Sequence, residues 1–145
     1  MKVLIPEKSA SIHYRVPYAD TDMMGVVYYG NYLTLFERCR NELMRQTGTS
    51  YRQMEQDGLM LPVIEAHVDY KQPAKYDDDL TITGWLEYAN GVKMKICCLI
   101  ERGDTLLASG HTVHACLSTK TLRPSRIPQY LADFVAAPQP SSDRT

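Results

Sequence analysis

The chain has 145 residues, which is the usual length of one domain. Lys and Arg number 16 and Asp and Glu 17, and the resulting charge of −1 excludes a strongly basic nucleic-acid-binding protein and an acidic disordered tail. Ten tyrosines make up most of the aromatic residues, so polar clefts or subunit contacts are expected for their hydroxyls. No apolar run approaches the roughly 20 residues of a membrane span, and residues 1–11 lack the apolar stretch of a secretory signal.

The four cysteines do not have the spacing of a zinc site: they are Cys39, Cys97, Cys98 and Cys116. Neighbouring residues on a strand point to opposite faces, so Cys97 and Cys98 cannot act together there. We therefore expect reduced thiols in a cytoplasmic protein, and the sequence implies no metal or redox cofactor.

The first half of the chain predicts a strand, a loop and a long helix. Alternation of apolar and polar residues predicts a half-buried strand over residues 11–17, followed by a loop. Apolar spacings of three and four predict a helix over residues 29–47, where Asn31 can supply a capping oxygen near the start. A short second helix is expected over residues 50–57.

The second half predicts strands joined largely by hairpins. Asn90-Gly91 predicts a type I′ turn between two of them. Strands that do not alternate with helices exclude a doubly wound parallel sheet and favour an α+β protein, with one helix packed on an antiparallel sheet. One helix covers one face, so we expect a partner subunit to bury more surface. The expected strands cover residues 62–70, 80–88, 92–101 and 105–118.

The densest polar cluster lies in the loop that leads into the long helix, from Tyr18 to Tyr32. A helix N-terminus presents unpaired N–H groups and a positive dipole end, which can stabilise a carbonyl oxygen that becomes anionic. A carboxylate just before it could attack the carbonyl carbon or activate water. The alternative is that Asp20, Thr21 and Asp22 only cap turns and the helix start.

This loop resembles the signature of the hotdog-fold acyl-CoA thioesterases of the 4-hydroxybenzoyl-CoA and Tol-Pal-associated types. It reads Tyr18-x-Asp20-Thr21-Asp22-x-x-Gly25-Val26-Val27-Tyr28-x-x-x-Tyr32. Supportive matches at residues 62–66, 70–74, 76–78 and 123–128 extend the resemblance over about residues 10–130.

The resemblance implies the hotdog fold, in which a curved antiparallel sheet wraps a long central helix. It implies one thioesterase domain, which we place at residues 1–137, and we expect residues 138–145 to form a flexible tail. The implied reaction is hydrolysis of an acyl-CoA to a free acid and coenzyme A, and the implied assembly is a homodimer or homotetramer.

Residue roles follow from the resemblance at matching positions. Asp22 matches the catalytic carboxylate, and Tyr29 matches the residue whose backbone N–H polarises the thioester carbonyl. Many Tol-Pal-type relatives have histidine at this position; with Tyr29 the imidazole role is absent, but the backbone role survives. A thiolate leaves readily, so a missing histidine is not fatal. The expected substrate-binding residues are Tyr18, Gly25, Val27, Tyr28, Arg123 and Arg126.

Two other carboxylates remain candidates. Asp20 lies two residues before Asp22, although hydrogen bonding within the turn is the alternative for it. Glu37 lies on the long helix, and another branch of hotdog thioesterases uses a helical glutamate. The structural alternative for Glu37 is an ion pair with Arg38, Arg40 or Arg45.

The histidines and basic residues give weaker signals. His111 and His114 resemble a metal pair but face opposite sides of a strand, whereas His67 and Glu65 share a face and could line a cleft. Coenzyme A carries phosphates, and the basic residues available near the strand ends and the tail are Lys71, Lys75, Lys120, Arg123 and Arg126.

Two other functions remain open at this point. A hotdog hydratase or dehydratase would need a histidine with an acidic partner, and the entry loop has no histidine. A non-enzymatic acyl-CoA-binding protein is the other alternative. We expect an acyl-CoA and a second copy of the chain as partners, and neither a nucleic acid nor a transmembrane segment.

Overall fold

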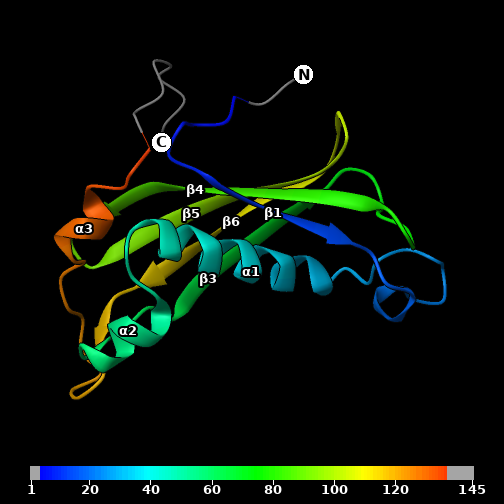
Figure 1. The fold of residues 1–145 in the computed structure, drawn as a ribbon. Coiled ribbons are helices and arrows are strands. Elements are labelled where there is room, and N and C mark those ends of the chain that lie inside the picture. Colours follow the sequence, from blue (N-terminus) through cyan, green and yellow to red (C-terminus); the bar gives the residue numbers. More distant parts are fainter. Residues whose placement is uncertain (1–3, 137–145) are drawn as a thin grey trace.

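The architecture is one curved antiparallel sheet over one long helix (Figure 1). The computed structural model describes residues 4–136, so the tail expected at residues 138–145 lies outside them. Five strands lie in the order β1-β4-β5-β6-β3, and α1 lies against one face of this sheet. The α+β class expected from the sequence is confirmed. The elements are β1 Ala10–Arg15, α1 Asn31–Gln46, β3 Val63–Tyr70, β4 Asp79–Asn90, β5 Lys93–Arg102 and β6 Thr105–Ala115.

Five shorter elements complete the chain. Helix α2 begins after Ser50, whose hydroxyl accepts the N–H of Gln53 at 3.0 Å, as a helix cap does. The prediction of one strand over residues 105–118 is wrong, because β6 ends at Ala115 and a separate strand, β7, follows. Between them the N–H of the buried Cys116 still donates to the carbonyl of Val92 beside the main sheet, and the next two residues pair with β2 instead. The elements are η1 Tyr18–Asp20, α2 Tyr51–Gln56, β2 Leu59–Met60, β7 Leu117–Ser118 (paired with β2) and α3 Gln129–Ala132.

The β4–β5 hairpin differs from its predicted turn type. Asn90 is paired with Lys93, so the two central residues are Gly91 and Val92. Gly91 has a positive φ of 60°, and Val92 is not among the residues with positive φ. A type I′ turn needs positive φ at both central residues, whereas a type II′ turn needs it at the first alone. The glycine does permit the hairpin, but from the first central position.

The core lies between α1 and the sheet. Phe36 and Cys39 on α1 are fully buried and face the sheet. Gly110 on β6 makes this approach possible, because a side chain there would meet the Phe36 ring and the carbonyl oxygen of His67. The absence of a side chain at Gly110 therefore lets α1 pack close to β6 and β3.

Strand β3 is an edge strand that α1 leaves uncovered. Val63 and Ile64 are 45% and 52% exposed, although both are apolar.

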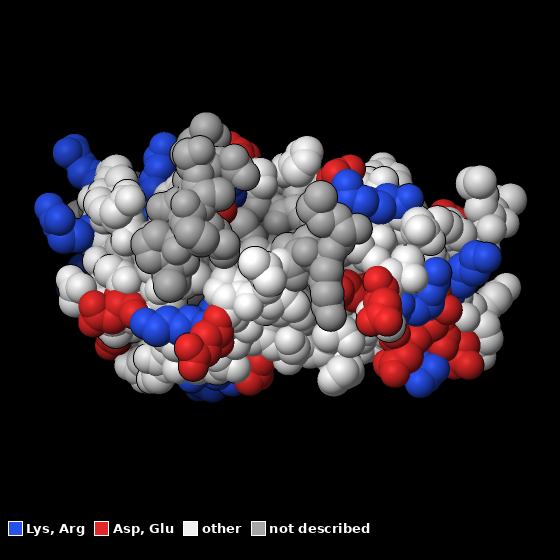
Figure 2. All heavy atoms as spheres, turned by 90° about the horizontal axis from the view of Figure 1, so that it is seen from above, with Lys and Arg blue, Asp and Glu red and all other residues white. Residues whose placement is uncertain are grey.

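On the side of the molecule seen in Figure 2, acidic and basic side chains lie intermixed among the residues described, so that side has no single sign of charge. Within residues 4–136, no helix is both long and apolar enough to cross a membrane.

Candidate active site

The turn around Asp22 is built by its own backbone and carboxylate. The N–H of Asp22 donates to the carbonyl of Val26 at 2.8 Å, and the N–H of Gly25 donates back to the carbonyl of Asp22 at 3.0 Å. Gly25 has φ +79°, a conformation that suits glycine. Oδ1 of Asp22 accepts the N–H of Met24 at 2.8 Å, while Oδ2 accepts no hydrogen bond from residues 4–136. One oxygen thus orients the carboxylate, and the other stays open.

Asp20 has a different role, because it joins β1, the loop and the helix start. Its carboxylate accepts the hydroxyl of Tyr14, and burial together with this hydrogen bond raises the pKa of Tyr14 to about 12. Its carbonyl accepts the N–H of Tyr28 at 3.0 Å and the side-chain amide of Asn31 at 3.2 Å. The Asn31 amide therefore donates to the loop instead of capping the helix, and that expectation is wrong.

Tyr29 lies in the last turn before α1. The residue at the N-cap position is Gly30, which forms no side-chain cap. Within residues 4–136, the backbone N–H groups of Tyr29 and Gly30 have no acceptor. Such N–H groups at the positive end of a helix can polarise a carbonyl oxygen.

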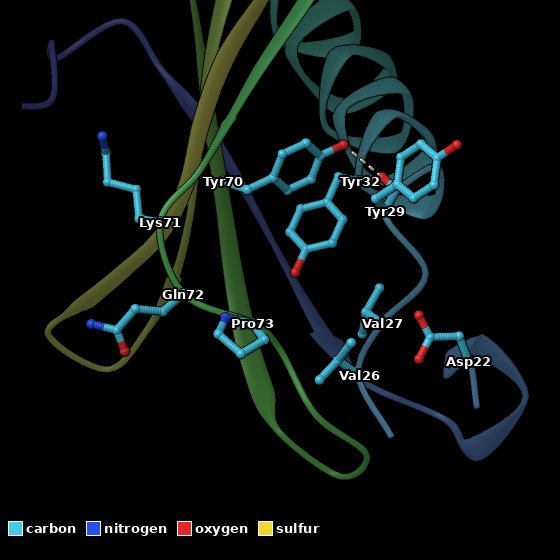
Figure 3. A pocket seen from close by; sticks show the side chains of 9 residues that line it. All are labelled: Asp22, Val26, Val27, Tyr29, Tyr32, Tyr70, Lys71, Gln72 and Pro73. Atoms are coloured by element: carbon cyan, nitrogen blue, oxygen red, sulfur yellow. Dashed lines mark hydrogen bonds between the residues drawn. The ribbon is translucent and has the colours of Figure 1, made fainter. Parts of the chain in front are cut away.

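A cavity of about 330 Å³ lies between the Asp22 loop, the start of α1 and the end of β3 (Figure 3). The carboxylate of Asp22 points inward toward Val27, and the rings of Tyr32 and Tyr70 lie on the opposite side. The structure therefore brings Asp22 and Tyr29, the two residues expected to act in catalysis, to one cavity. Its lining residues are Asp22, Val26, Val27, Tyr29, Tyr32, Tyr70, Lys71, Gln72 and Pro73.

Of the six residues expected to bind substrate, Val27 lines this cavity and three others surround the loop without lining it. Tyr18 packs edge-on against Tyr76 with ring centroids 5.8 Å apart. Tyr28 packs on Tyr29 with centroids 4.7 Å apart. Gly25 forms part of the turn around Asp22, where its positive φ is needed.

Arg123 and Arg126 are not brought to the cavity within one chain. They lie between β7 and α3, at the end of the molecule opposite the Asp22 loop (Figure 1). The physical reason is that β6 runs toward the end of the molecule where α2 lies, and β7 pairs there with β2 (Figure 1). Within one chain they do not line the cavity, and their role in substrate binding stays a prediction; Lys71 is the basic candidate that lines the cavity.

The resemblance already included Tyr32 and residues 70–74, and Lys71 was a basic candidate, but the sequence did not predict that Tyr32 and residues 70–73 form the far wall of the cavity. Tyr32 is the last residue of the loop signature, and it is buried. Residues 70–73 had a signal of their own, a tyrosine at a strand end followed closely by a proline. The spacing of residues could not predict that the end of β3 lies beside the start of α1.

Glu37 is exposed and forms none of its expected ion pairs within residues 4–136. The Arg38 guanidinium lies over the Tyr14 ring, 4.9 Å from its centroid. Arg45 pairs with Glu42 at 3.3 Å. Glu37 does not line the cavity either.

The histidines lie away from the cavity. His111 and His114 face opposite sides of β6, as expected: His114 is buried, while Nε2 of His111 is 2.8 Å from a carboxylate oxygen of Glu65. His67 stacks on His111 with centroids 5.5 Å apart, so it does not line the cleft that was expected.

Comparison with known proteins identifies the class of protein. Residues 16–135 match the Thioesterase-like superfamily, and the chain belongs to this family. It has the hotdog fold and is a thioester hydrolase.

Two curated relatives and one solved structure show the degree of likeness. The chain is 29% identical over 122 residues to the acyl-CoA thioester hydrolase YbgC of Escherichia coli O6:H1, covering 83% of this chain and 91% of the relative. It is 30% identical over 132 residues to the 1,4-dihydroxy-2-naphthoyl-CoA hydrolase of Thermosynechococcus vestitus, covering 89% and 90%. The DHNA-CoA thioesterase structure from Staphylococcus aureus has a TM-score of 0.79 at 31% identity, covering 87% and 85%.

Proposed function

We propose that this chain is an acyl-CoA thioesterase in which Asp22 supplies the reacting carboxylate and the backbone N–H of Tyr29 polarises the carbonyl. The observation that carries the proposal is that Asp22 and Tyr29 line one cavity, and that within residues 4–136 one carboxylate oxygen of Asp22 and the N–H of Tyr29 have no hydrogen-bond partner. The loop's resemblance to the 4-hydroxybenzoyl-CoA and Tol-Pal types supports the same two roles. The names of the relatives support coenzyme A as the thiol.

The chemistry needs few groups. Oδ2 of Asp22 attacks the thioester carbon, or takes a proton from the water that does, and the carbonyl oxygen becomes negative. The N–H of Tyr29 stabilises that charge, and one such donor is worth about 10²–10³ in rate. The C–S bond then breaks, and the thiolate leaves without a strong acid because a thiol has a pKa of roughly 8.5. If Asp22 attacks the carbon, water then hydrolyses the acyl–Asp22 anhydride, which releases the acid and restores the carboxylate. If Asp22 acts as a base, the proton that it took from water passes to the thiolate.

A hydratase or dehydratase is disfavoured by the cavity itself. Such an enzyme needs a histidine with an acidic partner, and no histidine is among the described lining residues. Hydrolysis that releases free coenzyme A, followed with a thiol reagent, separates thioesterase activity from hydration and from simple binding.

An aromatic acyl group fits the cavity better than a straight chain. The ring of Tyr32 meets that of Tyr70 edge-on at 5.0 Å, and Pro73 adds an apolar surface. Aromatic rings prefer such aromatic surroundings, and one relative is named for a naphthoyl-CoA substrate. In a panel of acyl-CoAs, we expect aromatic substrates to exceed aliphatic ones by about twofold to tenfold in kcat/KM, because one aromatic contact is worth about 0.5–1.5 kcal/mol. Equal kcat/KM across the panel would contradict this preference.

We also propose that the protein is at least a dimer, paired through β3. An uncovered edge strand with apolar residues on it is a template for another strand, and Val63 and Ile64 of β3 expose apolar side chains. Sedimentation at micromolar concentration should give the mass of two chains or more, and a stable 16.5 kDa monomer would refute the proposal.

A charge on the edge strand tests where the second copy binds. Ile64→Lys places an ammonium on an exposed position and should shift the mass toward the monomer, while the fold persists. Val92→Lys, at the partly exposed turn of the β4–β5 hairpin, is the matched control and should leave the mass unchanged.

A further inference from the structure

The start of α1 lacks the side-chain cap that usually fixes a helix N-terminus. Gly30 makes no cap, and the Asn31 side chain is engaged with the carbonyl of Asp20. The N–H groups of Tyr29 and Gly30 must nevertheless keep a fixed place relative to Asp22, if they are to meet a developing charge. Some other contact has to hold this peptide.

That contact comes from the sheet. The hydroxyl of Tyr70, the last residue of β3, donates to the backbone carbonyl of Tyr29 at 2.9 Å, as drawn in Figure 3. The same carbonyl accepts the N–H of Tyr32 over a longer distance of 3.3 Å. The carbonyl of the peptide that joins Tyr29 to Gly30 therefore accepts two hydrogen bonds, and the one from the Tyr70 hydroxyl is the shorter.

The Tyr70 side chain is itself held in place. Its ring packs against the ring of Tyr32, with an interplanar angle of 78°. The hydroxyl of Tyr32, in turn, accepts the N–H of Ala74 at 3.2 Å, so both tyrosines link α1 to the end of β3. Burial raises the pKa of Tyr70, which keeps its hydroxyl protonated and able to donate.

We propose that Tyr70 is a positioning residue for thioester hydrolysis: its hydroxyl holds the Tyr29–Gly30 peptide, and thereby the N–H groups at the start of α1, in register with Asp22. This inference rests on the proposed function. A hydrogen bond to a carbonyl also polarises the N–H of the same peptide, so the contact strengthens the Gly30 N–H as a donor. Tyr70 acts through the peptide, and its ring forms part of the cavity wall.

Tyr70→Phe removes the hydroxyl and keeps the ring. We expect kcat to fall roughly tenfold, because a small displacement of the donors is costly in the transition state, while KM stays within about twofold because the wall is intact. Tyr76→Phe is the matched control, since Tyr76 is similarly exposed, packs edge-on against another tyrosine and has no recorded hydroxyl hydrogen bond within residues 4–136. It should leave both constants unchanged.

A spectroscopic measurement reports the contact independently of activity. Tyr29-Gly30 is the single Tyr-Gly dipeptide of the chain, so labelling tyrosine carbonyls with ¹³C and glycine nitrogens with ¹⁵N selects this one peptide. In Tyr70→Phe its carbonyl carbon should move to lower frequency, because a hydrogen bond deshields that carbon. Tyr76→Phe should not move it.

Three outcomes overturn the inference: an unmoved carbonyl resonance, a moved resonance with wild-type kcat, or a change confined to KM. If Tyr70→Phe does not fold, Tyr70→Leu removes the same hydroxyl, and the same kcat and resonance criteria decide. The Asp22→Asn variant, measured in parallel, separates a failure of the proposed function from a failure of the inference about Tyr70. An active Asp22→Asn enzyme would refute the proposed function, whereas an inactive one with a fully active Tyr70→Phe enzyme would refute this inference alone.

Discussion

Replacing Asp22 by Asn should lower kcat at least about a hundredfold, because general acid–base assistance alone is worth about 10²–10⁴. The variant removes the negative charge and changes little else. The amide oxygen of Asn can still accept the N–H of Met24, as Oδ1 does in the wild type at 2.8 Å. Folding should therefore be intact, and steady-state release of coenzyme A together with a thermal unfolding curve would separate chemistry from stability.

Three variants show whether the effect belongs to Asp22. Tyr29→Phe keeps the backbone N–H and should retain most activity. Glu37→Gln should be fully active, because Glu37 is exposed and does not line the cavity. Asp20→Asn weakens the contact with Tyr14 and should lower stability more than kcat. Near-native turnover in Asp22→Asn, with turnover lost in Asp20→Asn or Glu37→Gln, would mean that the reacting carboxylate is another one.

The free energy of unfolding should fall by roughly 3 kcal/mol as the pH drops from about 6.5 to 4, through the single group His114. Burial, helped by the nearby Arg40 charge, lowers the pKa of His114 to about 4, against an opposing hydrogen bond to the carbonyl of Leu61. The unfolded chain then binds this proton from about pH 6.5 downward, and the folded chain does not until about pH 4. Stability due to His114 is complete above this window and is lost within it.

Chemical denaturation at several pH values, on wild type and His114→Gln, measures this contribution. The glutamine variant does not titrate, so the difference in unfolding free energy between the two proteins should shrink as the pH falls through the window. Carboxylates that titrate near pH 4 affect both proteins alike. His13→Gln is the control for an exposed histidine and should follow wild type. A constant difference between wild type and His114→Gln would contradict the assignment.

The sequence predicted those parts of the fold that depend on local spacing. The long helix, the short helix after Ser50 and the hairpin strands follow from periodicity and turn residues, and the structure confirms them. The choice of Asp22 over Asp20 came from the resemblance of the loop to the thioesterase signature, because a carboxylate before a helix start is a local pattern that both acids share. The break between β6 and β7 could not be predicted, because it depends on β7 pairing with β2, a strand distant in the sequence.

Contacts between distant segments were out of reach of the sequence. Nothing in the spacing shows that the hydroxyl of Tyr70 meets the carbonyl of Tyr29, 41 positions away. The two acids of the loop look equivalent in sequence, yet Asp20 is bonded to a tyrosine of β1 while Asp22 keeps one oxygen open. Their division of labour depends on which side chain the first strand places beside them.

The cavity is assembled from two unequal pieces of chain, and this division bears on how such an enzyme can diversify. Asp22 and Tyr29, whose carboxylate and N–H we propose to react, lie seven positions apart in one loop. Lys71, Gln72 and Pro73 come from a separate segment after β3 and line the opposite wall. Substitutions in that segment can reshape the space for the acyl group while the reacting groups stay as they are. Related proteins can thus differ in substrate through changes at residues 71–73, while the groups proposed to react are kept.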